Sequence, residues 1–208
     1  RYKNGVASTK ANEFALSIGG DNYCYVDVKR YTMLHDLYKQ RGAKTVLWGC
    51  SVEPKLLENA AIANDIARYD LITAREPYSY EALKAINNRT IKVADPAFTL
   101  NTAKVELPKG FLYKNTVGIN LSPMVISNET VKGAAFSNYL ALCQYILKET
   151  DMSIALIPHV VWGDTDDREP LNELFKALNC PERVCVINDC TCEELKGYIS
   201  ACRFFVAS

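Results

Sequence analysis

Short apolar runs alternate with amphipathic stretches along the first half of the chain. The apolar runs are of strand length, and they predict strands at 14–18, 45–48, 71–74 and 91–94. The stretches between them place apolar residues at helical spacing, and they predict helices at 31–41, 56–69 and 77–86. Gly42 is a natural stop for the first helix, and Pro77 suits the first turn of the third.

The same alternation returns in the second half, after an irregular stretch. Residues 101–114 carry Pro108, Gly110 and several lysines, and we interpret them as an interdomain connection. The apolar runs that follow predict strands at 117–121, 153–157, 184–187 and 204–207. Amphipathic spacing predicts helices at 137–149 and 170–178. A last helix is expected to reach about Cys202, because Thr191-x-x-Glu194 is a capping box.

Near-continuous apolar strands that alternate with helices are typical of parallel sheets covered on both faces. We therefore predict an α/β fold with two Rossmann-like domains, an N-terminal one over 1–104 and a C-terminal one over 105–208. A cleft between two such domains is the natural place for a ligand. Because the chain begins at Arg1 without Met and ends on the apolar run 204–208, we expect a fragment in which both domains are partial.

Composition narrows the class of protein. In 208 residues, 24 Lys and Arg balance 24 Asp and Glu, so the formal net charge is zero. This balance argues against nucleic acid as a partner, because phosphate neutralisation requires a basic excess. A hydrophobic share of 49% excludes a disordered chain. The sequence contains no run of about 18 apolar residues, so no transmembrane segment is expected; the oligomeric state stays open.

The eight cysteines point to reduced thiols rather than to a metal centre. Cys24, Cys50 and Cys143 lie inside apolar runs, where cysteine behaves as a small hydrophobic residue. The other five crowd near the C-terminus without the paired C-x-x-C spacing of a structural zinc site. We therefore expect buried thiols in a cytoplasmic protein, and no metal site.

Polar residues follow the predicted strands at the positions where each strand ends. They are Gly19, Gly20, Asp21, Asn22, Ser51, Arg75, Asp95, Asn120, Ser122, His159, Asn188 and Asp189. Open α/β sheets bind ligands at the carboxyl ends of their parallel strands. These residues are therefore the candidate site residues.

Several of these residues also have a purely structural interpretation. The Gly19–Asn22 turn can bring backbone amides close to a ligand, or it can be a plain β-to-α turn. Arg75 can grip a carboxylate or phosphate, or it can pair with Glu76 or Asp95; we favour the functional role. Asp95 can cap the following turn or hold a sugar hydroxyl. The turn lacks a G-x-G-x-x-G fingerprint, which argues against a classical NAD site.

Two histidines occur in the chain. His159 follows a predicted strand, and it is the candidate for acid–base chemistry. The acidic stretch 164–167 after it is weak evidence for a metal site, and Asp166 and Asp167 alternatively open the next helix. His35 is mid-helix beside Asp36, and we expect it on the surface.

Seven short motifs, in one order, resemble the polysaccharide pyruvyl transferase family. They are Ser17–Asn22 (SIGGDN), Trp48–Pro54 (WGCSVEP), Ile72–Leu83 (ITAREPYSYEAL), Val93–Phe98 (VADPAF), Gly118–Pro123 (GINLSP), Ile157–His159 (IPH) and Ile199–Ser208 (ISACRFFVAS). The resemblance covers most of the chain. It implies a glycosyltransferase-B-like architecture. It also implies transfer of a pyruvyl group from phosphoenolpyruvate to saccharide hydroxyls, forming a ketal in cell-wall or exopolysaccharide biosynthesis.

The resemblance also implies roles for the candidate residues. Arg75 is expected to contact the donor anion, and His159 to take part in proton transfer. The remaining residues would bind the saccharide or lipid-linked saccharide acceptor or line the cleft: Gly19, Gly20, Asp21, Asn22, Ser51, Asp95, Asn120 and Ser122. No cofactor is required besides phosphoenolpyruvate as donor substrate.

The family usually carries a strand–turn–helix before the position of Arg1. It also carries an Arg-x-His motif beyond Ser208, its best candidate for donor binding and acid catalysis, so activity of this fragment alone is in question. The alternatives are a sugar-nucleotide-dependent glycosyltransferase or epimerase of the same architecture, and a degenerate binding domain.

Overall fold

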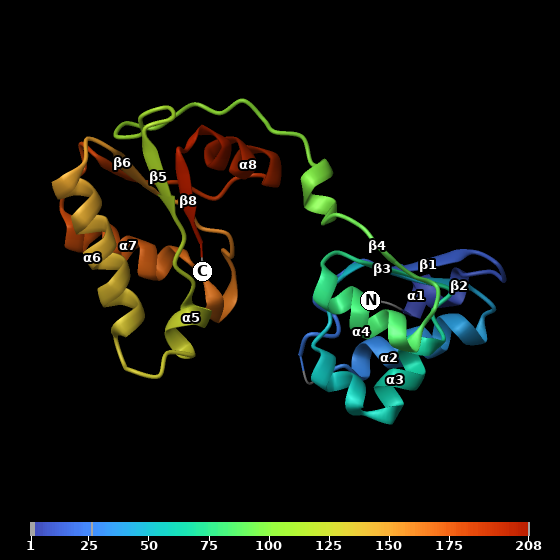
Figure 1. The fold of residues 1–208 in the computed structure, drawn as a ribbon. Helices are drawn as coiled ribbons and strands as arrows, with labels where there is room; N and C mark the ends of the chain where they lie inside the picture. The colour runs from blue at the N-terminus through green and yellow to red at the C-terminus, as the bar shows by residue number, and fades with distance from the viewer. Residues whose placement is uncertain (1–2, 26, 208) are drawn as a thin grey trace. The chain divides into compact units, whose positions relative to one another are not determined.

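The computed structural model describes residues 3–25 and 27–207, and the chain divides into two compact units (Figure 1). Unit 1 comprises residues 1–100, and unit 2 comprises residues 101–208. Each unit contains one four-stranded parallel sheet with its own helices. The α/β prediction with two parallel sheets is therefore confirmed.

The sheet of unit 1 has the strand order β1-β2-β3-β4. Its strands are β1 (Phe14–Ser17), β2 (Lys44–Cys50), β3 (Leu71–Ala74) and β4 (Thr90–Lys92). Its helices are α1 (Lys3–Ser8), α2 (Lys29–Gln40), α3 (Ala60–Ala67) and α4 (Pro77–Ile86), with 3₁₀ helices at Pro54–Glu58 and Pro96–Thr99. Because each new strand is added on the same side of the previous one, right-handed crossovers place α2, α3 and α4 on one face of the sheet (Figure 1).

The sheet of unit 2 has the order β7-β6-β5-β8. Its strands are β5 (Thr116–Ile119), β6 (Ser153–Leu156), β7 (Val184–Val186) and β8 (Phe204–Val206). Its helices are α5 (Pro123–Ser127), α6 (Ala134–Glu149), α7 (Arg168–Leu178) and α8 (Cys192–Ala201), with a 3₁₀ helix at Gly163–Thr165. The chain reverses direction after β7 and returns past β5, so β5 and β8 flank the switch point of this sheet.

Apolar packing follows these two topologies. In unit 1, Leu47 and Ile72 of the sheet are fully buried against Ile66 of α3 and Leu83 of α4. In unit 2, one core contains residues of β5, β6, α6 and α7. A second core contains Ala155, the loop residue Phe111 and residues of α8. The sheet of unit 2 is therefore covered on both faces.

Three local details differ from the predicted elements. The helix expected at 56–69 is split, because the Asn59 side chain accepts from Ala61 N and starts α3 there. Gly49 does not end β2; it lies inside the strand with φ +59°, at a register shift. The short helix α5, which starts after the Ser122 cap, was not expected.

The thiols are free, as the sequence indicates, but the prediction that they are buried is wrong for Cys192, which is exposed, and for Cys24, Cys180 and Cys190, which are partly exposed. Cys50, Cys143 and Cys185 are buried, and desolvation raises the pKa of each to about 12. These side chains are therefore neutral packing groups. Within the described ranges, the structure contains no helix with the length and apolar character that a membrane crossing requires.

Candidate functional site

The loops that follow the four strands of unit 1 converge on the guanidinium of Arg75. Its Nη2 donates to Asp21 Oδ1 at 2.5 Å, and its Nη1 donates to Asp95 Oδ2 at 3.2 Å. Its Nε donates to Ser51 Oγ at 2.9 Å. The structure thus brings together one predicted residue from each of the four loops, and we call these residues the Arg75 cluster.

Backbone contacts fix the positions of these loops. Arg75 N donates to Cys50 O at 3.1 Å, and Ser51 N donates to Gly20 O at 2.8 Å. Arg75 leaves β3 directly before α4, where the Glu76 carboxylate accepts from two backbone N–H groups of the first turn. Glu76 is therefore a helix cap, and the alternative pairing of Arg75 with Glu76 is not formed.

The Arg75 cluster carries one positive and two negative charges. Asp95 was expected either to cap or to bind, and its Oδ1 accepts from Ala97 N at 2.8 Å, which caps the 3₁₀ helix Pro96–Thr99. The ion pair between Arg75 and Asp95 is also formed. A guanidinium has five N–H donors, and the three hydrogen bonds leave two of them for a ligand. The cluster can therefore accept hydrogen bonds from hydroxyls and donate to one anionic group.

Two glycines leave room for neighbouring side chains where the chain passes this cluster. A Cβ at Gly20 would lie 2.5 Å from Arg75 Nη1, and a Cβ at Gly19 would collide with the Asn22 amide. Asn22 Nδ2 in turn donates to Ser17 Oγ at 2.9 Å. The two glycines let Arg75 and Asn22 approach the backbone, so this turn shapes the cluster.

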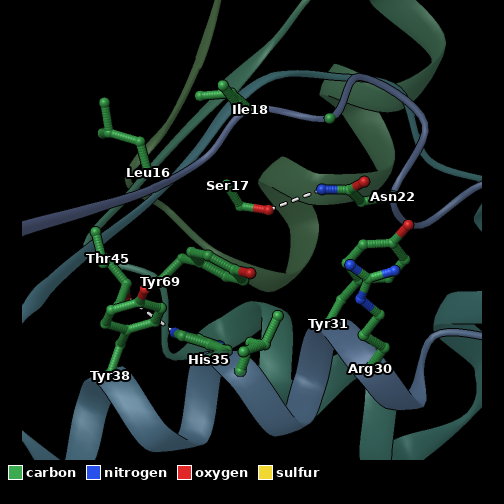
Figure 2. Close-up of a pocket in the computed structure, with 13 residues that line it drawn as sticks. Leu16, Ser17, Ile18, Asn22, Arg30, Tyr31, His35, Tyr38, Thr45 and Tyr69 are labelled. Atoms are coloured by element: carbon green, nitrogen blue, oxygen red, sulfur yellow. Dashed lines mark hydrogen bonds between the residues drawn. The ribbon is translucent and has the colours of Figure 1, made fainter. Parts of the chain in front are cut away.

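A pocket of about 440 Å³ lies between β1 and α2, beside the Gly19–Asn22 turn (Figure 2). Its wall combines aromatic rings with polar groups: Ser17, Asn22, Arg30, Tyr31, His35, Tyr38, Thr45 and Tyr69. The apolar part of its lining comes from Ala15, Leu16, Ile18 and Leu34.

The prediction that His35 lies on the surface is wrong. Its side chain is buried, with 4% of the residue exposed, and its ring stacks on Tyr69 at 3.8 Å. His35 Nε2 lies 2.9 Å from Thr45 Oγ1 (Figure 2). His35 Nδ1 lies 2.8 Å from Asp65 Oδ1. The neighbouring Asp36 pairs instead with Arg68 at 2.6 Å. His35 lies on the side of α2 that packs against the sheet, so its ring points inward.

Asp65 is the centre of this buried cluster. Its Oδ2 accepts from Tyr23 OH at 2.6 Å, and its Oδ1 accepts from Arg68 Nη2 at 2.5 Å in addition to His35. Burial by itself would raise the pKa of Asp65. The hydrogen bonds from His35, Tyr23 and Arg68 outweigh burial, so the pKa of Asp65 is lowered. The cluster ties α2 and α3 to the sheet.

In unit 2, Asn120 and Ser122 follow β5 at the switch point. Asn120 is buried, and its Nδ2 donates to Ile157 O at 3.1 Å and to Asp167 Oδ2 at 2.8 Å. Ser122 Oγ accepts from Met124 N at 3.2 Å and caps α5. The Asn120 side chain therefore links the loops after β5 and β6, and the Ser122 side chain starts α5.

His159 follows β6, and part of its surface is open to solvent. Its ring stacks on Phe205 of β8, with 5.6 Å between centroids and 13° between planes. Desolvation lowers the pKa of His159, and the charge of Asp167 opposes this effect in part. The imidazole is therefore neutral at neutral pH.

Asp167 was not predicted as a site residue. Its Oδ2 accepts from His159 N at 2.9 Å and from Val160 N at 3.0 Å, and the residue is 1% exposed. Asp166 behaves as expected of an acid that opens α7, since its Oδ1 accepts from Arg168 N. The sequence contains no signal that separates the inward Asp167 from the outward Asp166.

The candidate residues thus form two sets, one in each unit. Gly19, Gly20, Asp21, Asn22, Ser51, Arg75 and Asp95 lie together at the carboxyl edge of the first sheet. Asn120 and His159 meet at Asp167 in the second sheet, and Ser122 lies two residues beyond Asn120. Within residues 3–25 and 27–207, no group of three or more His, Cys, Asp or Glu side chains is placed to hold a metal.

The sequence model of one family, described as polysaccharide pyruvyl transferase, matches residues 2–208. No curated protein and no solved structure matches the chain.

Proposed function

The chain belongs to the polysaccharide pyruvyl transferase family, and from this premise we propose that it transfers a pyruvyl group from phosphoenolpyruvate to two hydroxyls of a saccharide. The observation that carries the proposal is the Arg75 cluster, in which four loops place a cation and three oxygen acceptors at one sheet edge. A donor that is an anion and an acceptor that is rich in hydroxyls require both kinds of group.

Arg75 is the proposed contact to the donor. Its ion pairs with Asp21 and Asp95 fix the guanidinium, and the two N–H groups that remain can bind a carboxylate or phosphate oxygen. Asp21 is the more exposed of the two acids, with 49% of its side chain accessible. Asp21, Asp95 and Ser51 are therefore proposed to accept hydrogen bonds from saccharide hydroxyls, with Gly19, Gly20 and Asn22 shaping that wall.

The proposed reaction starts with protonation of the methylene carbon of phosphoenolpyruvate, which leaves the central carbon electrophilic. One saccharide hydroxyl forms a C–O bond there and loses its proton to a base. The bond to the phosphate then breaks with its electron pair, and phosphate leaves. A second hydroxyl attacks the same carbon and loses its proton, which closes the ketal. One hydroxyl proton balances the proton added to the methyl group, and the other leaves with phosphate.

His159 is the proposed proton-transfer residue among the described side chains, and Asn120 and Ser122 line its side of the sheet edge. The chemistry requires neither a metal nor a redox cofactor. We further propose a glycosyltransferase-B type of architecture, a cytoplasmic location and a saccharide or lipid-linked saccharide acceptor in cell-wall or exopolysaccharide synthesis. The family membership supports these finer statements.

Calorimetry with phosphoenolpyruvate tests the donor role of Arg75. The wild type is expected to bind the donor, and Arg75→Ala should weaken binding by more than about 1.5 kcal/mol, the range of a hydrogen bond to a charged group. Gly20→Ala should weaken it as well, because the new methyl group displaces the guanidinium. Arg41→Ala is the matched control, since Arg41 is an exposed arginine at the end of α2.

Uridine diphosphate serves as the competing ligand in the same experiment. Binding of the nucleotide without binding of phosphoenolpyruvate would favour a sugar-nucleotide enzyme, for which the switch point of unit 2 is the expected location. Donor affinity that is unchanged in Arg75→Ala would contradict the role of Arg75.

A further inference from the structure

Asp167 is a buried carboxylate without a cationic partner among the described residues. Its exposed fraction is 1%, and its Oδ2 accepts from Asn120 Nδ2, His159 N and Val160 N at 2.8–3.0 Å. Its Oδ1 is buried and has no hydrogen-bond donor within the described part of the chain. Burying a charge is costly unless the charge is compensated. A buried carboxyl oxygen without a donor costs stability, so the structure keeps the Asp167 side chain here at some expense.

The hydrogen bonds alone do not require that charge. A single carbonyl oxygen, as in asparagine, can accept N–H donors at the position of Oδ2. The second oxygen accepts nothing, so it adds no contact to the anchor. Among the described residues, the charge of Asp167 acts on one titratable side chain, that of His159, whose pKa it raises.

The carboxylate also joins the loops around His159. Asp167 N donates to Val160 O at 2.8 Å, while Oδ2 holds His159 N, so the loop from β6 to α7 closes on itself. Asn120, which bridges to Asp167, is bonded in turn to Val206 O of β8. The imidazole stacks on the Phe205 ring of the same strand. Asp167 thus holds the backbone of His159, while the His159 ring packs on β8.

We propose that Asp167 is a positioning residue for His159, which it orients as a general base and whose protonated form it stabilises. This inference rests on the proposed function. In the step it describes, the O–H bond of a saccharide hydroxyl breaks, the oxygen bonds to the central carbon of the donor, and the proton goes to a ring nitrogen of His159. The charge of Asp167 favours the protonated form of His159, so it lowers the free energy of the new imidazolium.

The charge state of His159 fits a base rather than an acid. Desolvation lowers its pKa below the ordinary value of 6.5, so the ring is neutral and able to accept a proton at neutral pH. The Phe205 ring packs on His159 and carries no charge. Asp167 is the charged group acting on His159 within the described residues.

NMR titration of the two histidines tests the coupling without any activity. With ¹³C-labelled histidine in this chain, the signal lost in His159→Gln identifies His159. In Asp167→Asn we expect the pKa of His159 to fall further, because the charge that opposes desolvation is gone. Asp166→Asn, a neighbouring acid that contacts Arg168, should leave the titration of His159 unchanged. Asp167→Ser is the second variant if the asparagine variant does not fold.

An unchanged or raised pKa of His159 in both Asp167 variants would overturn the inference, whatever the enzyme binds. Pyruvyl transfer gives the second readout. We expect His159→Gln to lower kcat about 100-fold, in the range of general acid–base catalysis. Asp167→Asn should lower kcat about tenfold and move the acidic limb of the pH–kcat profile to lower pH. If kcat falls in Asp167→Asn but the acidic limb of the pH–kcat profile does not move, Asp167 has a structural role only. That result would also overturn the inference.

The two proposals fail in different ways. If phosphoenolpyruvate does not bind, the proposed function fails while the NMR titration still reports on the Asp167–His159 pair. If the donor binds and both Asp167 variants turn over at the wild-type rate, the positioning role fails while the proposed function stands.

Discussion

Asp65 shows how one buried side chain can depend on partners from several elements. It accepts hydrogen bonds from His35, Tyr23 and Arg68, which come from α2, from the loop after β1 and from the end of α3. Because these bonds keep its pKa lowered despite burial, the charged form contributes to the stability of unit 1. This contribution is present above the ordinary pKa of 3.8, and it is lost as the pH falls through the lower folded-state pKa.

Replacing this carboxylate should therefore have a pH-dependent effect. We expect Asp65→Asn to lower the free energy of unfolding by about 3 kcal/mol at neutral pH, as for other broken buried pairs. The difference from wild type should narrow below pH 3.8, where the wild-type carboxylate becomes protonated in the unfolded state and then in the folded state. Urea unfolding at several pH values measures this difference in the free energy of unfolding.

Asp36→Asn is the control for that experiment, because Asp36 makes an exposed ion pair with Arg68 that is worth at most about 1 kcal/mol. An equal loss of stability in both variants, or a difference that does not change with pH, would contradict the assigned role of Asp65.

The candidate residues whose position follows from a general rule were predictable from the sequence. Asp21, Ser51, Arg75 and Asp95 each lie in the loop that follows a strand, and parallel strands bring their carboxyl ends to one edge. His35 and Asp167 follow no such rule. The direction of each side chain depends on helix rotation and loop closure, which are set by partners 30 and 47 positions away in Asp65 and Asn120.

Elements were predictable where a local signal and the apolar pattern agree. The capping box at Thr191 and Glu194 is formed, with Thr191 N donating to Glu194 Oε2 at 2.9 Å, and α8 starts there. The break before α3 was not predicted, because the apolar spacing continues across Asn59 while its side chain stops the helix. A single polar capping residue within a continuous apolar pattern is therefore a weak predictor of a helix boundary.

Removing the cap of α8 should destabilise unit 2. Thr191→Ala leaves Glu194 N without its side-chain acceptor, and we expect a loss of about 1 kcal/mol in the free energy of unfolding. Thr191→Ser should restore most of it, because the hydroxyl is retained. Thr102→Ala, at an exposed position of the irregular stretch, is the control. Chemical denaturation followed by circular dichroism measures all three; a loss as large in Thr102→Ala would exclude a capping effect.

At the scale of the whole chain, alternation of strands and helices predicted two parallel sheets but not their strand orders. The first sheet adds each strand beside the last, whereas β8 of the second sheet returns to pair with β5. Both arrangements have the same apolar pattern along the sequence. The order depends on which sheet edge each crossover reaches, and this is decided by packing between distant segments.

Each unit has its own core, so a substitution that leaves a cavity in one core should lower the stability of that unit first. Ile72 and Leu156 are fully buried in units 1 and 2. We expect Ile72→Ala to destabilise unit 1 by about 3 kcal/mol, and Leu156→Ala to do the same to unit 2. His35 and His159 lie one in each unit, so their NMR signals during urea unfolding report on the two separately. Equal shifts of both signals in either variant would show that the chain unfolds as one unit.

The two strand orders have different consequences while the chain is being synthesised. In unit 1 every strand pairs with its predecessor, so the sheet can grow in step with the emerging polypeptide. In unit 2 the central strand β5 receives its last neighbour only when β8 arrives, since Val117 pairs with Phe204. Long-range pairing of this kind is slow and leaves a strand edge open in the meantime. The sheet of unit 1 can therefore form strand by strand from its N-terminal end during synthesis. In unit 2, the edge of β5 that pairs with β8 stays unpaired until β8 has been synthesised.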